Sequence, residues 1–101
     1  MEHRITADGI ETFGVLTPWS GVRAIVLSRE PAVTIGDVTV AAGYHQIVVE
    51  LVSGDFLEIV EGSPSWQTVI EWLPIHRALL VEDVTALIAS DAPGDTVLWH
   101  G

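Results

Sequence analysis

The sequence has no cysteine and no lysine. Because cysteine is missing, disulfide bonds, zinc–thiolate sites and cysteine nucleophiles are all excluded. Because lysine is missing, the four permanent cations are all arginines, and against fourteen acidic residues they leave a formal net charge of −10. A surface this acidic repels the phosphates of nucleic acids and of anionic lipids. We therefore expect neither nucleic acid nor a membrane surface among the partners.

Long hydrophobic runs are missing as well, although 49% of the residues are hydrophobic. The longest apolar runs, such as residues 78–81, are far shorter than the ~20 residues of a membrane-spanning helix. The first residues carry no apolar leader segment. The length of 101 residues suits one domain. We expect a single cytoplasmic domain over residues 1–101.

Motifs for catalysis or cofactor binding are missing too. The four histidines have no partner residue at the spacing of a metal site. The sequence contains no Gly-x-Ser-x-Gly nucleophile turn and no glycine-rich phosphate loop. We therefore predict a protein that is not an enzyme, with no catalytic residues, no metal and no cofactor.

Residues 3–61 alternate apolar and polar side chains with a period of two, which predicts about seven short antiparallel strands, one of them over residues 10–16. The clearest signal is a hairpin over residues 33–40 that turns at Gly36-Asp37. Its register places similar side chains opposite each other: Ile35 and Val38, Thr34 and Thr39, Val33 and Val40. So many short strands are typical of a small barrel or of two packed sheets.

A second hairpin is expected over residues 44–61, with a three-residue loop at 53–55. Its inward pairs would include Val49 with Ile59, and its outward pairs would be Val48 with Val60 and Glu50 with Glu58. Like charges directly opposite each other cost some stability. The two glutamates are therefore either solvated carboxylates on an exposed face or part of an acidic docking surface.

From Ser63 the apolar period changes to 3.6, which predicts a helical part over residues 63–90. Ser63 suits the N-cap of the first helix, and Pro74 suits its end or a kink. The apolar stripe of this helix consists of Trp66, Val69, Ile70 and Leu73. Residues 75–90 form either one helix or a loop followed by a helix, and residues 91–101 either a tail or a short last strand. Strands followed by one or two helices indicate an α+β domain.

The order of seven strands and a C-terminal amphipathic helix is that of the pleckstrin-homology-like (PH-like) barrel. Gly9-Ile10 after a turn, and then Trp19 three residues before Val22, resemble the "turn, Gly-Ile, strand, Trp-x-x-Ile/Val" run of bacterial PH-like domains. The resemblance covers residues 3–73. It implies a barrel with a helix over one open end, Trp19 packed at the barrel mouth, and a scaffold that mostly serves binding. The basic loop of phosphoinositide-binding PH domains is absent, so lipid binding is not implied.

Several residues are candidates for a protein interface, because exposed aromatic and aliphatic side chains often anchor partners. The candidates are Trp99, Trp72, Tyr44, Val48 and Val60, together with Glu50 and Glu58, the two glutamates of the second hairpin. Trp99, which lies in a short apolar run, either anchors a neighbouring protein or folds back onto the helices.

Three functions fit these features. The first, which we favour, is a small non-enzymatic protein-interaction module that binds a protein partner or itself as a homodimer, because the apolar content is high and outward valines are expected. The alternative is an acidic inhibitor or immunity-type protein that masks a basic surface of its partner. A second alternative is a small-molecule-binding barrel, although so short a chain leaves little interior volume.

Overall fold

The computed structural model describes residues 3–90 and 93–101, and it has strands first and helices after them. Its nine strands are β1 (His3–Ile5), β2 (Gly9–Thr12), β3 (Val15–Pro18), β4 (Val22–Glu30), β5 (Val33–Ile35), β6 (Val38–Ala41), β7 (Tyr44–Leu51), β8 (Phe56–Val60) and β9 (Gly94–His100). A 3-10 helix, η1 (Trp19–Gly21), and two α-helices, α1 (Trp66–His76) and α2 (Val84–Ala89), complete the described elements. The predicted α+β class is confirmed.

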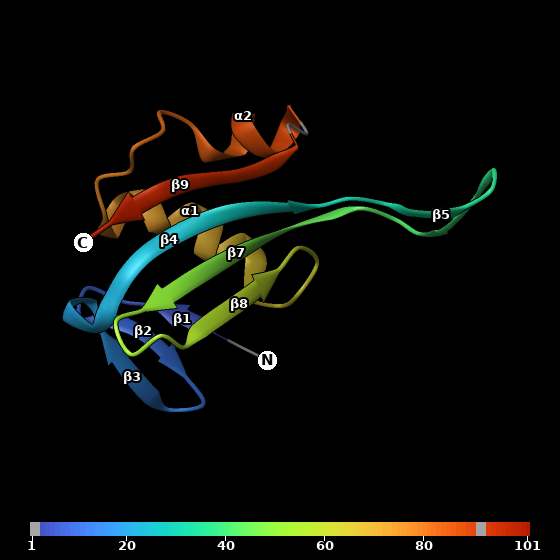
Figure 1. Ribbon diagram of the computed structural model, residues 1–101. Helices are drawn as coiled ribbons and strands as arrows, with labels where there is room; N and C mark the ends of the chain where they lie inside the picture. Colours follow the sequence, from blue (N-terminus) through green and yellow to red (C-terminus); the bar gives the residue numbers. More distant parts are fainter. Residues whose placement is uncertain (1–2, 91–92) are drawn as a thin grey trace.

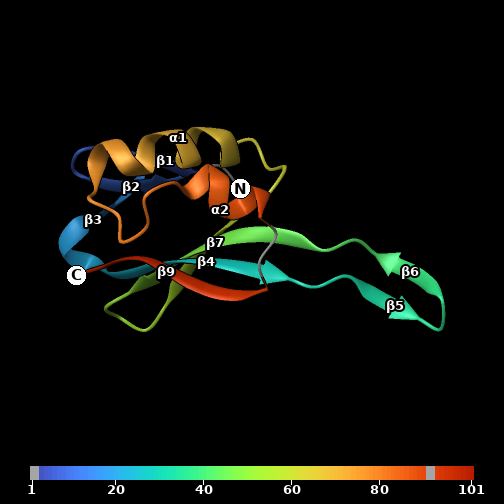
Figure 2. The same ribbon diagram turned by 90° about the horizontal axis from the view of Figure 1, so that it is seen from above.

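The strands form three antiparallel sheets, and none of them closes into a barrel. The first sheet has the order β1-β2-β3, the second has the order β8-β7-β4-β9, and the third is the β5–β6 hairpin. The barrel alternative is therefore wrong: η1 separates β3 from β4, and no ladder joins the first two sheets in the described part of the chain. Figures 1 and 2 show the first sheet and both α-helices on one face of the second sheet. The resemblance to PH-like domains stays a prediction.

The core lies between the second sheet and the layer formed by the helices and the first sheet. Its fully buried aliphatic side chains come from both layers and include Ile10 of β2, Ile25 of β4, Ile47 and Val49 of β7, Ile59 of β8 and Leu98 of β9. The predicted stripe of α1 is buried in full: Trp66, Val69, Ile70 and Leu73. Full burial of one such aliphatic side chain stabilises the fold by about 1.5–3 kcal/mol.

The first α-helix begins two residues later than predicted. Its N-cap is Ser65 and not Ser63, and no side-chain hydrogen bond caps it. The Ser65 hydroxyl instead accepts a hydrogen bond from the backbone N–H of His3 at 2.7 Å. Because Ser65 and His3 are both buried, this bond satisfies two polar groups and ties β1 to the start of α1.

The end of α1 lies beyond Pro74. The helix continues through the proline to His76, and Arg77 is its C-cap, so Pro74 lies in the last turn and does not end the helix. A loop separates α1 from α2, so residues 75–90 are not one helix. The carboxylate of Asp83 caps α2 by accepting a hydrogen bond from the N–H of Ala86 at 3.1 Å.

The strand predicted over residues 10–16 is wrong, because the chain turns back at Phe13-Gly14. β2 pairs with β3, and Thr12 lies opposite Val15. The φ angles of the turn residues are 52° for Phe13 and 77° for Gly14, which is the backbone of a tight two-residue hairpin turn. A positive φ is uncommon for phenylalanine, so the alternation of side chains alone gave no sign of this turn.

The β5–β6 hairpin forms largely as predicted. Its turn is at Gly36-Asp37, and two of the predicted pairs are present: Ile35 with Val38 and Thr34 with Thr39. A β-bulge then places Val33 opposite Ala41 and not opposite Val40. The third predicted pair is therefore wrong, because the bulge inserts one extra residue on β6.

The β7–β8 hairpin also forms, but its register differs by two residues from the predicted one. The observed pairs are Glu50 with Phe56, Val48 with Glu58, and Gln46 with Val60, so both predicted outward pairs are wrong. The loop has three residues, 52–54, because the N–H of Leu51 bonds to the carbonyl of Asp55 at 2.8 Å. Gly54, with a φ of 94°, takes the left-handed position that ends such loops.

The shape of the molecule is elongated. Its radius of gyration is 14.2 Å, above the roughly 13 Å of a compact chain of about 100 residues. The excess comes from the β5–β6 hairpin, which projects well beyond the two larger sheets (Figure 1). Within residues 3–90 and 93–101, no helix is both long and apolar enough to cross a membrane.

Candidate functional site

The β5–β6 hairpin and the residues that lead into it (31–43) form an arm that leaves the body of the protein (Figure 1). Its large aliphatic side chains are between 53% and 71% exposed: Val33, Ile35, Val38 and Val40. The register puts Ile35 and Val38 on one face and Thr34 and Thr39 on the other. An isolated two-stranded hairpin is marginally stable at best in water. The arm therefore has an apolar face that no described element covers.

The arm is nearly free of charge in a strongly acidic protein. Its only charged side chain is Asp37, which lies in the turn. At its root, the guanidinium of Arg29 donates hydrogen bonds to the backbone carbonyls of Glu30 and, at 3.3 Å, Tyr44. A side chain at Gly43 would collide with that guanidinium. Arg29 thus joins the two strands where the arm leaves the second sheet.

The outer face of the second sheet, on the side away from the helices, is another surface that no described element covers (Figure 2). Its centre is a row of aliphatic side chains on three neighbouring strands, which we call the valine row: Val48 on β7, Val26 on β4 and Val97 on β9. Val26 and Val48 point outward, since the residues on either side of each are buried. Acidic residues surround the valine row: Glu30, Glu50, Glu58 and Asp95.

The predicted interface residues of the second hairpin lie on this outer face. Tyr44 and Val60 are exposed near the root of the arm. Glu50 forms an ion pair with Arg23 at 3.1 Å, and both side chains are exposed. Such exposed pairs contribute about 0–1 kcal/mol. Glu58 is exposed and lies opposite Val48, whereas Glu50 lies opposite Phe56. The two carboxylates are therefore not directly opposite each other.

Trp99 folds back onto the body of the protein. It is half-buried on β9 and meets Trp19 edge to face, with the ring centroids 6.0 Å apart. The Arg77 guanidinium lies 4.2 Å from the centroid of Trp19 and 5.4 Å from that of Trp99. The indole N–H of Trp19 donates to the carbonyl of Thr6 at 3.2 Å. This cluster joins η1, the end of α1 and β9, which gives Trp99 a structural environment.

Trp72 is 45% exposed. Its ring stacks on that of His76, one turn later in α1, with the centroids 5.6 Å apart. Beside the two rings is a hollow of about 390 Å³ between α1 and β1. Arg4 lies at its edge, but its guanidinium is paired with Glu11 at 3.0 Å. The hollow therefore offers a ligand an apolar wall and little unpaired charge.

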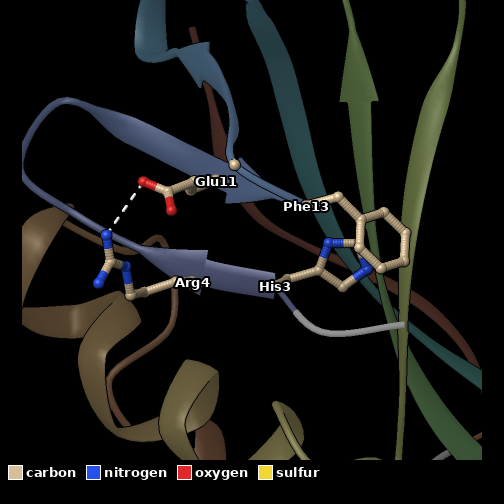
Figure 3. Close-up of a pocket in the computed structure, with 5 residues that line it drawn as sticks. His3, Arg4, Glu11 and Phe13 are labelled. Carbon is tan, nitrogen blue, oxygen red and sulfur yellow. Dashed lines mark hydrogen bonds and ion pairs between the residues drawn. The ribbon is translucent and has the colours of Figure 1, made fainter.

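A second hollow, of about 280 Å³, lies on the first sheet, and Figure 3 shows side chains that line it. The side chains labelled there are His3, Arg4, Glu11 and Phe13. The imidazole of His3 is buried, and its Nδ1 lies 2.7 Å from the hydroxyl oxygen of Thr12. Burial lowers the pKa of His3, and the nearby backbone of Glu58 opposes this only in part. Among the described residues, the side-chain partner of this imidazole is thus a threonine hydroxyl and not the carboxylate that orients the histidine of a catalytic triad.

Neither hollow adds a metal site, and in the described part of the chain no three potential metal ligands come together. No protein-family model, no curated protein and no solved structure matches this chain. The functional interpretation therefore depends on the surfaces of the molecule itself, above all on the arm and the valine row.

The sequence predicted the hairpin of the arm, but it did not predict that this hairpin is exposed. Its turn and most of its register follow from local residue types, but whether a hairpin packs on a core depends on distant strands. Pro31-Ala32 separates β4 from β5, and Ala42-Gly43 separates β6 from β7 at the same level. This paired interruption is the signal that could have separated the arm from the second sheet.

Proposed function

We propose that this protein is a small, acidic, non-enzymatic interaction module that self-associates as a homodimer. The observation that carries the proposal is the arm, whose four large aliphatic side chains are all more than half exposed. Contiguous exposed apolar surface commonly marks a protein–protein contact. Identical chains most often assemble around a two-fold axis, and an interface of this kind that includes one arm also includes the other.

The free energy available from the arms supports two of them acting together. Full burial of an aliphatic side chain contributes about 1.5–3 kcal/mol. With 53–71% of each side chain still exposed, covering one arm contributes about 4–7 kcal/mol. Association itself costs about 4–15 kcal/mol in lost freedom of motion. One arm is barely sufficient, whereas two arms covered at once contribute about 8–14 kcal/mol.

The acidic-inhibitor alternative has less support. A docking surface for a basic partner needs carboxylates that are close together and free to bind. Of the carboxylates around the valine row, Glu50 is instead paired with Arg23, and Glu30 accepts a hydrogen bond from the side-chain amide of Gln46. The most exposed apolar element, the arm, carries only one charge and would add little to such an interface. The barrel alternative loses its basis because the sheets are not closed.

Sedimentation velocity over a wide range of protein concentration tests the proposal. The test variant is Ile35→Thr/Val38→Thr, which keeps both strand positions β-branched but makes the apolar face of the arm polar. The matched control is Val15→Thr/Val52→Thr, since both of these valines are as exposed as those of the arm and lie elsewhere. We expect the native protein and the control to dimerise and the arm variant to be monomeric. A native protein that stays monomeric at the highest concentration would overturn the proposal.

A further inference from the structure

We infer that each arm docks on the valine row of a second copy of this chain. In this arrangement the apolar face of each arm lies on the outer sheet face of the other copy, around a two-fold axis. The inference rests on the proposed self-association and adds to it the surface that the arm recognises.

The two surfaces match in size. The valine row crosses three neighbouring strands, which at about 4.8 Å between strands is roughly 10 Å. β6 has four residues and is therefore about 13 Å long, with β5 about 4.8 Å beside it. Sheets with aliphatic inner faces pack at about 10 Å from each other with interdigitating side chains. The arm would cover the valine row as a small second layer of sheet.

The arm of the same molecule does not cover its own valine row. The molecule measures 47 × 29 × 24 Å, and both views show the arm pointing away from the sheets (Figures 1 and 2). The hydrogen bonds from Arg29 to backbone carbonyls hold the two strands together at the root. Since the arm extends away from its own sheet, a layer over the valine row would come from another molecule.

Charge favours the arm over the other surfaces of a second copy. Each copy carries a formal net charge of −10, and like charges brought together oppose association. If two outer sheet faces met directly, Glu30, Glu58 and Asp95 around one valine row would face the same carboxylates of the other copy. Of the acidic residues there, only Glu50 is paired with an arginine in the described part of the chain. An arm brings only Asp37 to that face. The arm is thus an apolar element that can approach the acidic rim with little repulsion.

Reciprocal docking also covers more apolar surface than arm-on-arm packing. If the two arms packed only on each other, the exposed part of both valine rows would remain in water, and this part comes mainly from Val97, since Val26 and Val48 are half-buried. With each arm on the opposite row, two arm faces and two rows are covered in one symmetric interface. Because the gain from apolar burial is roughly proportional to the area removed from water, this arrangement is the more stable one.

Cysteine cross-linking tests the docking surface, and the native chain has no cysteine to interfere. Copies with Val38→Cys on the arm are mixed with copies that carry Val97→Cys in the valine row, and a short bismaleimide is added. We expect a cross-linked mixed dimer. The control mixture replaces the second variant with Val52→Cys, which lies on the exposed β7–β8 loop outside the valine row and should not cross-link.

A second measurement is the effect of a charge on affinity. Val97→Glu places a carboxylate in the valine row, whereas Val52→Glu adds the same charge at the control position. We expect the dimer dissociation constant to rise at least tenfold for Val97→Glu and less than threefold for Val52→Glu, because only the first carboxylate would be desolvated. Circular dichroism of both variants shows whether the fold is retained.

The outcomes separate the inference from the function on which it rests. Cross-links between Val38→Cys copies alone, or equal effects of the two glutamates, would overturn docking on the valine row and leave self-association in place. A native protein that is monomeric would overturn both. A mixed cross-link together with selective weakening by Val97→Glu would support the inference.

Discussion

Replacing Trp99 with alanine tests whether an aromatic cluster holds the last strand in place. Trp99 is half-buried on β9, lies edge-on to Trp19 at 6.0 Å, and is 5.4 Å from the guanidinium of Arg77. The substitution removes both contacts while leaving the backbone pairing of β9 with β4 intact. Its effect on stability therefore measures the side-chain cluster and not the sheet.

The expected effect is large for a half-buried residue. Truncating a fully buried tryptophan to alanine costs about 3–5 kcal/mol, and half-burial reduces this to about 2 kcal/mol. The edge-to-face contact with Trp19 adds about 0.5–1 kcal/mol. We expect the free energy of unfolding to fall by about 2–3 kcal/mol, which for a domain of this size lowers Tm by roughly 10–20 °C.

The assay is urea unfolding followed by far-UV circular dichroism, since the substitution itself alters tryptophan fluorescence. The Ile35→Thr/Val38→Thr background excludes the contribution that the proposed dimerisation would make to apparent stability. Trp72→Ala is the matched control, because that ring is 45% exposed and stacks on His76; its expected cost is below about 1 kcal/mol. If Trp99→Ala costs no more than this control, the cluster does not have the structural role derived above.

Three further perturbations address other parts of the fold. Because burial lowers the pKa of His3 below its ordinary 6.5, the unfolded chain binds a proton there that the folded chain does not, so stability falls as the pH drops below about 6.5. Between about pH 7 and pH 5 the urea midpoint should fall more steeply for the native protein than for His3→Gln. Equal slopes would contradict a lowered pKa of His3 in the folded protein. Gly9→Ala should cost about 1–3 kcal/mol in thermal unfolding, since the new Cβ would overlap the carbonyl oxygen of Thr17; a harmless substitution would refute that close approach. Asp83→Ala should cost about 1 kcal/mol by removing the cap of α2, while Asp83→Asn keeps most of it, and an equal loss in both variants would argue against the capping bond.

Local patterns were sufficient to assign side chains to faces. In the β7–β8 hairpin the predicted register is wrong by two residues, yet Val49 and Ile59 are buried as predicted, because a shift of two keeps every side chain on its face. The left-handed Gly54 determines the observed register. A glycine at the last loop position is thus a stronger signal for register than the pairing of similar side chains.

Contacts between distant segments could not be predicted from the sequence. Nothing in residues 94–100 selects β4 over another sheet edge as the pairing partner. The outward position of Val48 was predictable from its own hairpin. That Val26 and Val97 lie beside it was not, because this depends on the pairing of β4 with β7 and with β9. The candidate interface was therefore found in part, at the end of one hairpin, while the row and the arm emerged only with the three-dimensional pairing.

The position of β9 affects how the protein is made. β9 is an edge strand of the second sheet, although it is the last described element of the chain. Before it is synthesised, one side of the nine-residue strand β4 has no pairing partner. Pairing between segments so distant in sequence is slow to form. Until β9 pairs, a sheet made of β8, β7 and β4 has an open edge on β4, to which a strand of another chain can add.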